Sequence, residues 1–459
     1  MAFPFDPIVV NNIATRSDAY KSGSHHKMYV PDAEDCVDYA EMRLGGKHPE
    51  TVFMGAQPIM MKYLAGEVIT HKGLDIARRV VGSNTGPGSF NEEGWRQIVD
   101  ECDGRLPLEI AAQPEGSVLP ESTVLYTIRP TAPDYVWLVG HIEPLILKTW
   151  YPSTVATNGR AIRKMINRYY RKTMGSTAGA EYALHDFGYR SVSSEESAEI
   201  GGLAHLVHFA GTDTVPALLE GVNYYGADLA TLGHSVPASE HSVMTQLGRE
   251  GEAEIVRQLI ETFPTGVLSC VADSYDIYNF VSNIVGRIHR DAILARTDGP
   301  FVVRPDSPTP THPVTADQVV WIYEELWKLF PEGRTINDLD YRVLDPHVGV
   351  LWGDGISDEG IEEIYVALEA AGFATTIVVG QGGKRLQLPQ RDDQRWALKQ
   401  SAQKRDGIWY DIQKQPLDKS KWSKTGTFED LNLPVVFRNG EILRYYTFDE
   451  VRERANEGL

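Results

Sequence analysis

The chain contains 459 residues, of which 42% are hydrophobic and 23% charged, and its 44 Lys and Arg against 63 Asp and Glu give a formal net charge of −19. This length and composition are typical of a globular protein with two or three domains, or with one large barrel and additions. The acidic balance argues against a nucleic-acid partner, which would require a basic face, but leaves room for a small anionic ligand in a local basic pocket.

The beginning of the chain, MAFPFDPIVVNN, has neither a basic region nor a long apolar core, so we expect no signal peptide. No uninterrupted apolar run approaches the roughly 18 residues that cross a bilayer. The three cysteines, Cys36, Cys102 and Cys270, are odd in number and widely spaced, which fits neither a disulfide framework nor a zinc site. We therefore expect a cytoplasmic protein in a reducing compartment, without a membrane partner.

Loops and short strands are predicted in the first 180 residues. Small residues gather at 81–88 (VGSNTGPG) and 173–180 (TMGSTAGA), which favours loops. Between them, residues 105–130 hold short β-rich runs separated by Pro and Gly, which indicates strands and turns.

From about residue 183, apolar runs alternate with helical patterns. Thr315 and Gln318 form a predicted capping box at the start of one helix, and Ser357 and Gly372 are the predicted start and stop of the next. A β-α-β-α-β order with nearly all-apolar strands predicts a parallel sheet with crossover helices. The apolar runs are 266–273, 301–306, 347–354 and 374–383.

Each apolar run ends in polar or glycine residues: Asp273, then Arg304 with Asp306, then Gly353 with Asp354, then Gly380 with Gly382 and Gly383. Ligands of barrels and open α/β sheets bind at the carboxyl ends of the strands. Asp and Gly are also ordinary strand-exit residues. Four such endings in series, one of them carrying a cation, favour a shared site.

Residues 384–424 invert the local charge, because they hold eleven Lys or Arg and five Asp, a net +6. Such a segment can attract a small polyanion such as phosphate or pyrophosphate, or it can be a solvated surface or a subunit contact. The preceding Gly-Gln-Gly-Gly at 380–383 favours phosphate, and the absence of a GxxxxGK[ST] motif excludes a P-loop NTPase.

The segment LHDFGYRSVSSEES, residues 184–197, places His185, Asp186, Phe187, Tyr189 and Arg190 within six positions. On composition alone, the phenylalanine could belong to the core and the arginine to an ion pair with the acids at 195–199. A ring, a cation, an imidazole and a carboxylate together are instead typical of one wall of a ligand pocket.

Long irregular motifs in this order resemble those of nicotinamide phosphoribosyltransferases, over about residues 11–455. They are SDAYKSGSHHKMY, FNEEGW, WYPSTVATN, LHDFGYR, GTDTV, HSVPASEHS, DSYDIYN, VVRPDS, GDG and VFRNGEILRYYTFDEVR. The resemblance implies transfer of phosphoribosyl from 5-phosphoribosyl 1-pyrophosphate to nicotinamide. It also implies Mg²⁺, ATP acting through a phosphohistidine, and a homodimer with composite active sites.

The implied fold is the irregular (β/α) barrel of type II phosphoribosyltransferases beside an α+β domain built from both chain ends. We expect the α+β domain to comprise residues 1–150 and 390–459, and the barrel residues 151–389. Two alternatives are a nicotinate phosphoribosyltransferase, which shares the fold, and a non-catalytic sensor of nicotinamide or its mononucleotide.

The resemblance also implies how the base is bound. Phe187 would stack on one face of the nicotinamide ring and Tyr20 of the partner subunit on the other. Asp213 would accept a hydrogen bond from the carboxamide and repel nicotinate, although it could also be an N-cap for the helix beginning near Thr214. Ser235 would belong to the same pocket. Arg190 would lie near the carbonyl of the ring and the leaving group.

The remaining roles concern phosphates and ribose. His241 would accept phosphate from ATP, with Asp273 holding its ring. Arg304 and Asp306 would bind the ribose 5-phosphate and the ribose hydroxyls. Gly353, Asp354, Gly382 and Gly383 would complete that pocket, and Arg43, Arg391, Lys399 and Lys414, with Lys421 as an additional candidate, would bind pyrophosphate across the dimer. Mg²⁺ would rest mainly on substrate phosphates, with its protein ligands unknown.

Two positions depart from the family pattern. Pro308-Thr309-Pro310 follows Ser307 where Gly-Asn-Pro is usual, and a proline there removes an N–H donor. Ala397 stands where a serine near phosphate is common. Both departures predict weaker affinity for phosphate or ATP.

Overall fold

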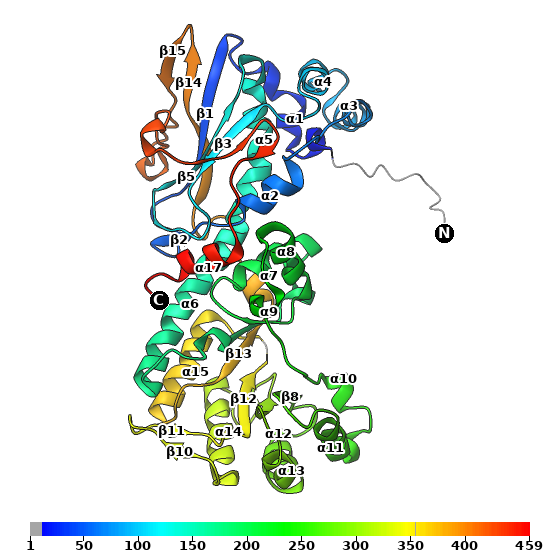
Figure 1. Cartoon of the computed structure of the whole chain (residues 1–459), viewed down its shortest axis with the longest axis vertical. Helices are drawn as coiled ribbons and strands as arrows, with labels where there is room; N and C mark the ends of the chain where they lie inside the picture. The colour runs from blue at the N-terminus through cyan, green and yellow to red at the C-terminus, as the bar shows by residue number, and fades with distance from the viewer. Residues whose placement is uncertain (1–11, 354) are drawn as a thin grey trace, which may run out of the picture. The chain divides into compact units, whose positions relative to one another are not determined.

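The computed structural model describes residues 12–353 and 355–459 (Figure 1). The chain divides into two compact units. Unit 1 comprises the residues up to Thr157 together with 223–226 and 390–455, and unit 2 comprises 158–222, 227–389 and 456–459.

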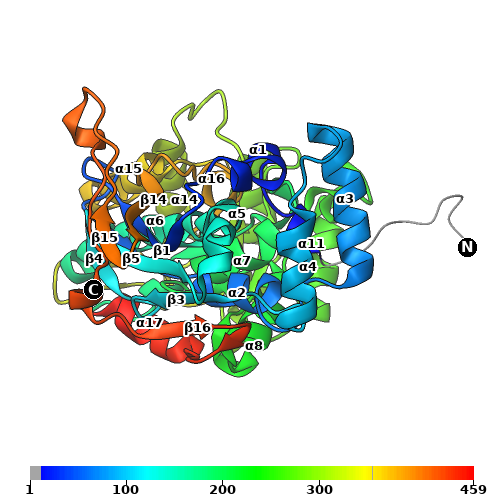
Figure 2. The same ribbon diagram turned by 90° about the horizontal axis from the view of Figure 1, so that it is seen from above.

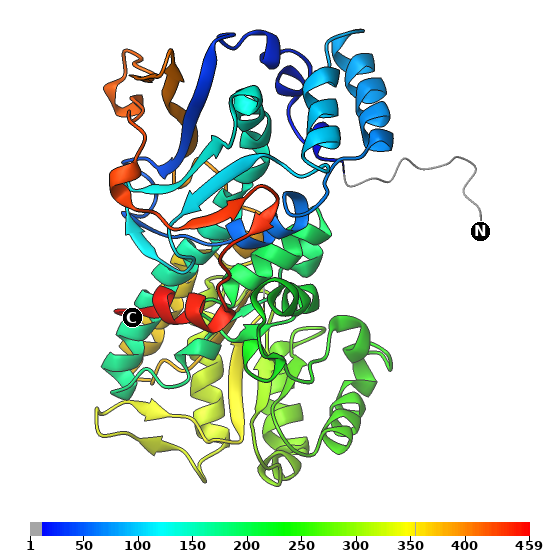
Figure 3. The ribbon, with the colours of Figure 1, turned by 45° about the horizontal axis from the view of Figure 1, so that its top comes forward.

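Unit 1 is built on a seven-stranded sheet with the order β15-β14-β1-β5-β3-β16-β17, in which all the pairs are antiparallel. The strands are β1 (Ala33–Met42), β3 (Leu108–Ala112), β5 (Val124–Pro130), β14 (Trp396–Arg405), β15 (Ile408–Asp411), β16 (Val435–Arg438) and β17 (Glu441–Ile442). β1 lies beside β14 (Figure 3), and Ala40 pairs with Leu398, so distant parts of the chain form one sheet. A separate pair joins β2 (Glu50–Val52) to β4 (Val118–Pro120), and the strands predicted within 105–130 are therefore confirmed.

Helix α5 (Val136–Ile146) packs against β1 and β5. The other helices are α1 (Ala19–Gly23), α2 (Ala56–Tyr63), α3 (His71–Thr85), α4 (Glu92–Glu101) and α17 (Phe448–Asn456), and Figure 2 shows α3 and α4 side by side. The loop predicted at 81–88 is wrong as far as Thr85. The buried stripe of Leu74, Ala77 and Val81 continues at helical spacing, and α3 ends only at Gly86, whose φ is +102°.

Unit 2 contains a six-stranded sheet with the order β7-β6-β13-β12-β9-β8, in which all the pairs are parallel. Its strands are β6 (Leu184–Asp186), β7 (Gly211–Thr212), β8 (Leu268–Val271), β9 (Phe301–Arg304), β12 (Val348–Trp352) and β13 (Val378–Gln381). Gly211 bridges His234, and Ala238 bridges Ser269. The extended segment 234–239 therefore joins the two edge strands, and the curled sheet becomes the expected irregular α/β barrel.

Helices surround these strands. They are α6 (Trp150–Met174), α7 (Glu195–His205), α8 (Val215–Tyr225), α9 (Leu229–Leu232), α10 (His241–Met244), α11 (Glu252–Thr262), α12 (Ile277–Asn279), α13 (Arg290–Leu294), α14 (Thr315–Leu329), α15 (Asp358–Ala370) and α16 (Gly383–Leu386), with a small hairpin of β10 (Thr335–Ile336) and β11 (Arg342–Val343). After β8 the chain forms α12 and continues directly as a π-helix, Phe280–Ile288. Loop 173–180 was predicted correctly from residue 175, just after α6 ends.

Of the two predicted helix N-caps, the one at α15 is confirmed and the one at α14 is wrong. Ser357 caps α15, since its Oγ accepts from the Gly360 N–H at 3.1 Å. The capping box of Thr315 and Gln318 is wrong, because the N-cap of α14 is Val314, which has no side-chain cap. The Gln318 amide instead donates to Ser307 O and accepts from the N–H of Thr309.

Two of the helices bury apolar faces in the core. The buried residues are Val319, Ile322, Tyr323, Leu326 and Phe330 for α14, and Ile361, Ile364, Tyr365 and Leu368 for α15. In the described part of the chain, no helix combines the length and hydropathy needed to span a bilayer. All three cysteines are free thiols.

Candidate active site

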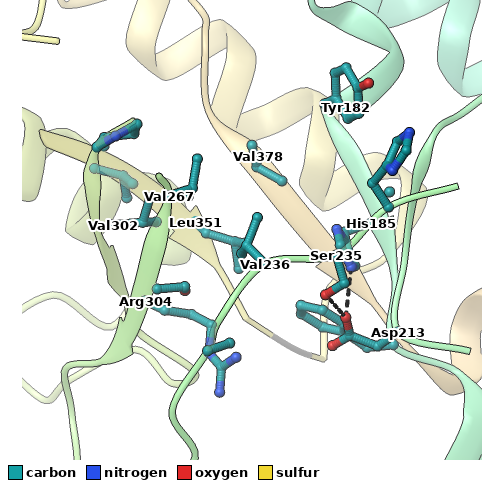
Figure 4. Close-up of a pocket in the computed structure, with 18 of the residues that line it drawn as sticks. Tyr182, His185, Asp213, Ser235, Val236, Val267, Val302, Arg304, Leu351 and Val378 are labelled. Atoms are coloured by element: carbon teal, nitrogen blue, oxygen red, sulfur yellow. Dashed lines mark hydrogen bonds and ion pairs between the residues drawn. The ribbon is translucent and has the colours of Figure 1, made fainter. Parts of the chain in front are cut away.

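A cavity of about 400 Å³ lies within the barrel of unit 2 (Figure 4). Alternate residues of the strands point into it, such as Val302 and Arg304 of β9. Val236, Val267, Leu351 and Val378 give it an apolar wall. Its polar lining residues include His185, Asp213, Ser235 and Arg304.

Asp213 is the centre of the polar group. Its Oδ1 accepts a hydrogen bond from His185 Nε2 at 2.9 Å and another from Ser235 Oγ. Burial alone would raise the pKa of the Asp213 carboxyl, but the hydrogen bonds from His185 and Ser235 outweigh burial and hold this pKa below its ordinary value. The residue therefore stays ionised at neutral pH. Both hydrogen bonds end at Oδ1. Among the described residues, no N–H group of α8 donates to this carboxylate, so Oδ2 is available to a ligand.

Phe187 follows β6 and lines the same cavity. Its backbone N–H donates to Gln381 O at 3.1 Å. The ring lies against Gly380, where an added Cβ would stand 2.0 Å from Cε2, and it is tilted against His185 with 4.9 Å between centroids. The Arg304 guanidinium carbon lies 5.9 Å from the centre of the ring. Phe187 is thus a fixed flat wall with a cation over its ring.

The sequence placed Asp186 in the wall of a ligand pocket, but in the structure this residue is buried, does not line the cavity, and is a positioning residue. Its carboxylate is fully buried and accepts from the Gly188 N–H at 2.7 Å and from Thr212 Oγ1 at 3.4 Å, and its carbonyl accepts from the Asp213 N–H at 2.9 Å. Burial raises the pKa of this carboxyl. Through its carboxylate and its carbonyl, Asp186 ties the turn that carries Phe187 to the turn that carries Asp213.

A second cavity, of about 420 Å³, adjoins the first and shares Phe187, Asp213 and Arg304 with it. Its further lining residues are Tyr189, Arg190, Ser191, Glu240, His241, Ser242, Asp306 and Gly353. Arg190 is exposed and makes no ion pair with the acids at 195–199 in the described chain, where Glu195 instead accepts from Tyr189 Oη at 2.9 Å. Two arginines therefore face a cavity that could hold a phosphorylated ligand.

His241 begins α10 and lies closer to the carboxylate of Asp306 than to that of Asp273. Its Nδ1 lies 3.0 Å from Ser274 Oγ, and its Nε2 lies 3.3 Å from Asp306 Oδ2 but 3.9 Å from Asp273 Oδ1. Asp273 Oδ2 accepts from the N–H groups of Asp306 and Ser307 at 2.9 and 3.0 Å. The carboxylate nearest to the imidazole is thus Asp306, while Asp273 holds the backbone of the loop that carries Asp306.

Arg304 and Gly353 both lie against the Asp306 carboxylate. The Arg304 Nη2 donates to Ser239 O at 2.9 Å, and its Nε lies 3.6 Å from Asp306 Oδ1. A Cβ at position 353 would stand 1.7 Å from Asp306 Oδ1, so only glycine fits there. Asp354 lies outside the described residues. Gly382 and Gly383 follow β13 at the same edge of the sheet, but neither lines the two cavities.

The remaining predicted residues belong to unit 1. A cavity of about 450 Å³ brings together Arg43, Arg391, Lys399 and Lys421, and Ala397 also lines it. Burial lowers the pKa of the Lys399 ammonium group. Two predicted residues lie outside this cavity: Lys414, which is exposed, and Tyr20 of α1, which is 53% exposed.

Comparison with known proteins places these two units in one family. Residues 182–441 match the model of the nicotinate phosphoribosyltransferase (NAPRTase) family, and residues 12–110 match the N-terminal domain of nicotinamide phosphoribosyltransferase. The nicotinamide phosphoribosyltransferase of Xanthomonas campestris is 37% identical over 97% of this chain and 98% of its own. That of Acinetobacter baylyi is 31% identical over 83% and 82%.

Solved structures support the same fold at low identity. Nicotinate-nucleotide pyrophosphorylase from Pyrococcus furiosus aligns with a TM-score of 0.57 and 16% identity over 100% of this chain and 97% of that one. Human nicotinic acid phosphoribosyltransferase aligns with a TM-score of 0.53 and 13% identity over 98% and 93%. By its family models and its relatives, the chain belongs to the nicotinamide phosphoribosyltransferases, within the nicotinate phosphoribosyltransferase family of enzymes.

Proposed function

We propose that the protein transfers phosphoribosyl from 5-phosphoribosyl 1-pyrophosphate to nicotinamide in NAD biosynthesis. The observation that carries this proposal is the ionised Asp213 carboxylate beside the flat wall of Phe187, in an apolar cavity that adjoins one lined by arginines. A flat neutral amide fits the first cavity and a sugar phosphate fits the second.

Asp213 is the basis of the choice between the two bases. The free Oδ2 can accept a hydrogen bond from a carboxamide NH₂. A nicotinate carboxylate at about 4 Å would meet a repulsion of about 4 kcal/mol at an effective dielectric constant of 20. This geometry favours nicotinamide over the alternative of a nicotinate phosphoribosyltransferase.

The transfer itself needs positioning and charge neutralisation more than covalent help. The ring nitrogen of nicotinamide attacks C1 of the ribose as the C1–O bond to pyrophosphate breaks, and pyrophosphate leaves with the electron pair. Arg304 and Arg190 would stabilise phosphate charge, and Asp306 would accept hydrogen bonds from ribose hydroxyls. Mg²⁺ is usually held by one or two carboxylates and substrate phosphates, and the Asp306 carboxylate in the second cavity fits that requirement.

We also propose a homodimer in which unit 1 of one copy completes the site of the other. Val215, Leu219 and Leu229 of α8 and α9 expose a set of apolar side chains close in sequence to Asp213, as an interface requires. Tyr20 of the partner subunit would cover the base. Arg43, Arg391, Lys399 and Lys414 of the partner subunit would bind pyrophosphate.

The role of ATP is a further part of the proposal. His241 would attack the terminal phosphorus of ATP, ADP would leave with the bridging oxygen, and hydrolysis of the phosphohistidine would follow each transfer. Its support is the position of the imidazole beside Asp306 in the arginine-lined cavity.

The decisive assay combines the purified protein with 5-phosphoribosyl 1-pyrophosphate, Mg²⁺ and either base, with and without ATP. We expect mononucleotide from nicotinamide alone. Asp213→Asn should relax the preference, whereas Asp291→Asn, which changes a fully exposed aspartate, should keep it. Equal turnover of both bases by the unmutated protein would contradict the specificity argument. Binding of nicotinamide without any turnover would favour a sensor.

The histidine is tested separately. His241→Ala should lose the stimulation by ATP and retain a reduced basal turnover. The matched control is His71→Ala, which removes an exposed histidine of α3. Full stimulation by ATP in the His241 variant would show that the phosphoryl group is accepted elsewhere.

A further inference from the structure

The loop of residues 305–314 connects β9 to α14 and presents Asp306 to the second cavity. It contains the Pro308-Thr309-Pro310 sequence that departs from the family pattern. Two sets of contacts outside the cavity hold it in place, and neither touches a residue that we have assigned to substrate.

The first set is a clip formed by Gln318, whose side chain is fully buried in the first turn of α14. Its Nε2 donates to Ser307 O at 3.1 Å, and its Oε1 accepts from the Thr309 N–H at 2.7 Å. One amide therefore brackets Pro308, which has no N–H to offer. Backbone groups that would otherwise be unpaired near the core are satisfied.

The second set is a closed ring of hydrogen bonds around Thr309. The His312 N–H donates to Thr309 Oγ1 at 3.1 Å, Thr309 Oγ1 lies 2.6 Å from Tyr278 Oη, and Tyr278 Oη lies 2.7 Å from His312 Nδ1. Each hydroxyl can accept one hydrogen bond and donate one. Tyr278 and His312 also pack on the Trp321 ring of α14, at centroid distances of 4.6 and 5.8 Å.

The clip lies next to Asp306, Asp273 and His241 in space, and its partner Ser307 follows Asp306 in sequence. Ser307, whose carbonyl accepts from Gln318, donates its own N–H to Asp273 Oδ2, as Asp306 does. The turn is therefore held from both sides, by Asp273 and by Gln318. Between them stands the Asp306 carboxylate, 3.3 Å from His241 Nε2.

We propose that Gln318, supported by Tyr278 and His312, is a positioning residue that fixes the Asp306 carboxylate for ribose binding and for the approach to His241. The inference rests on the proposed function for its kinetic part and on the geometry of the loop for its structural part. In this proposal the two prolines restrict the backbone of the loop. A loop restricted by Pro308 and Pro310 needs only a few anchors to keep one conformation.

Gln318→Leu tests the clip, because leucine keeps the buried volume but offers neither amide group. We expect the KM for 5-phosphoribosyl 1-pyrophosphate to rise about tenfold, which corresponds to the loss of a buried backbone partner. The KM for nicotinamide should change less than about twofold, since the base contacts other strands. The amide hydrogens of Asp306 and Ser307 should exchange about tenfold faster, because they report local opening of the loop.

Two other variants provide a second test and a control. Tyr278→Phe preserves the packing on Trp321 and removes one hydroxyl, so it should shift the same parameters in the same direction by about threefold. If Gln318→Leu fails to fold, this second variant decides. Asp317→Asn changes an exposed side chain of the same turn and should match the unmutated protein.

A purely structural role for Gln318 would lower kcat and thermal stability while leaving the KM for the sugar phosphate and the exchange rates unchanged, and that result would overturn the proposal. Failure of the unmutated protein to form mononucleotide would refute the proposed function instead. The exchange rates would then still decide whether the clip orders the loop.

Discussion

Replacing Gly380 by alanine should displace the Phe187 ring from the base site. The new Cβ would stand 2.0 Å from Cε2 and 2.3 Å from Cδ2 of that ring. Carbon atoms in contact are normally about 3.5 Å apart, so the ring must retreat by about 1.5 Å or turn away. The Asp186 tie and the bond from the Phe187 N–H to Gln381 O hold the backbone, so the ring has to move within its pocket.

The loss of activity in Gly380→Ala can be estimated from the stacking of the Phe187 ring on the base. Loss of an aromatic stacking contact is worth about 1 kcal/mol, which raises the KM for nicotinamide about fivefold. Misplacement of a bound reactant by about 1 Å adds a loss in kcat, so kcat/KM should fall about 100-fold in total. Steady-state kinetics with nicotinamide as the varied substrate measures both terms, and circular dichroism checks that the fold is intact.

Gly349→Ala is the matched control, because it adds a methyl group to the same cavity. Its Cβ would lie 3.5 Å from Val302, an ordinary contact, so the Phe187 ring stays in place and kcat/KM should change less than about threefold. A double-mutant cycle sharpens the result: in a Phe187→Ala background, Gly380→Ala should add almost nothing. Unchanged kinetics in the Gly380 variant, or additive effects in the cycle, would refute the reasoning.

Further predictions concern a buried acid in each unit and the cationic cavity. Burial raises the pKa of Asp38 to about 7. Between pH 4 and 7 the unfolded chain ionises this residue and the folded protein does not, so the free energy of unfolding should fall by about 1.4 kcal/mol per pH unit relative to Asp38→Asn, as measured by urea denaturation at several pH values. Asp186→Asn should cost about 1–3 kcal/mol of stability in the same assay and raise the KM for nicotinamide, because the tie between two turns is weakened. Lys399→Ala should weaken inhibition by pyrophosphate more than Lys414→Ala does, because of these two lysines Lys399 lines the cationic cavity of unit 1 and Lys414 does not. Equal effects would contradict this grouping.

The parallel half of the fold was predictable because its signals are local. Apolar strands, helical spacing and the Ser357 cap each depend on a few neighbouring residues, and all of them are found. The closure of the barrel was not predictable from pattern. Segment 234–239 contains Pro237 and polar residues, and it pairs with the edge strands through backbone groups, such as His234 O with the Thr212 N–H, that carry no side-chain signature.

Some residues of the site could also be predicted from the sequence, and others could not. Phe187, Asp213, Ser235, Arg304 and His241 could be named because they lie in recognisable motifs, and the structure gathers them around two adjoining cavities. The supporting residues could not be named, since their role depends on contacts between elements far apart in the chain. Gln318 is an example: its spacing from Thr315 predicted a helix cap, but its amide bonds to a loop nine to eleven residues earlier.

That loop also changes what Pro308 means for phosphate binding. Removal of an N–H matters only if the loop would have presented that N–H to the ligand. The N–H groups of Asp306 and Ser307 are bonded to Asp273, and that of Thr309 is bonded to Gln318, so this turn already uses its backbone donors internally. On the proposed function, this loop then offers phosphate no backbone donor from Asp306, Ser307 or Thr309, and the binding would depend on side chains such as Arg304. A guanidinium holds phosphate through two parallel hydrogen bonds in a fixed fork, which lysine cannot reproduce. Arg304→Lys should therefore weaken the binding of the sugar phosphate severely, whereas Pro308→Gly should weaken it only as far as the loop loses its order; a strong gain of affinity in the glycine variant would show that the backbone does contribute a donor.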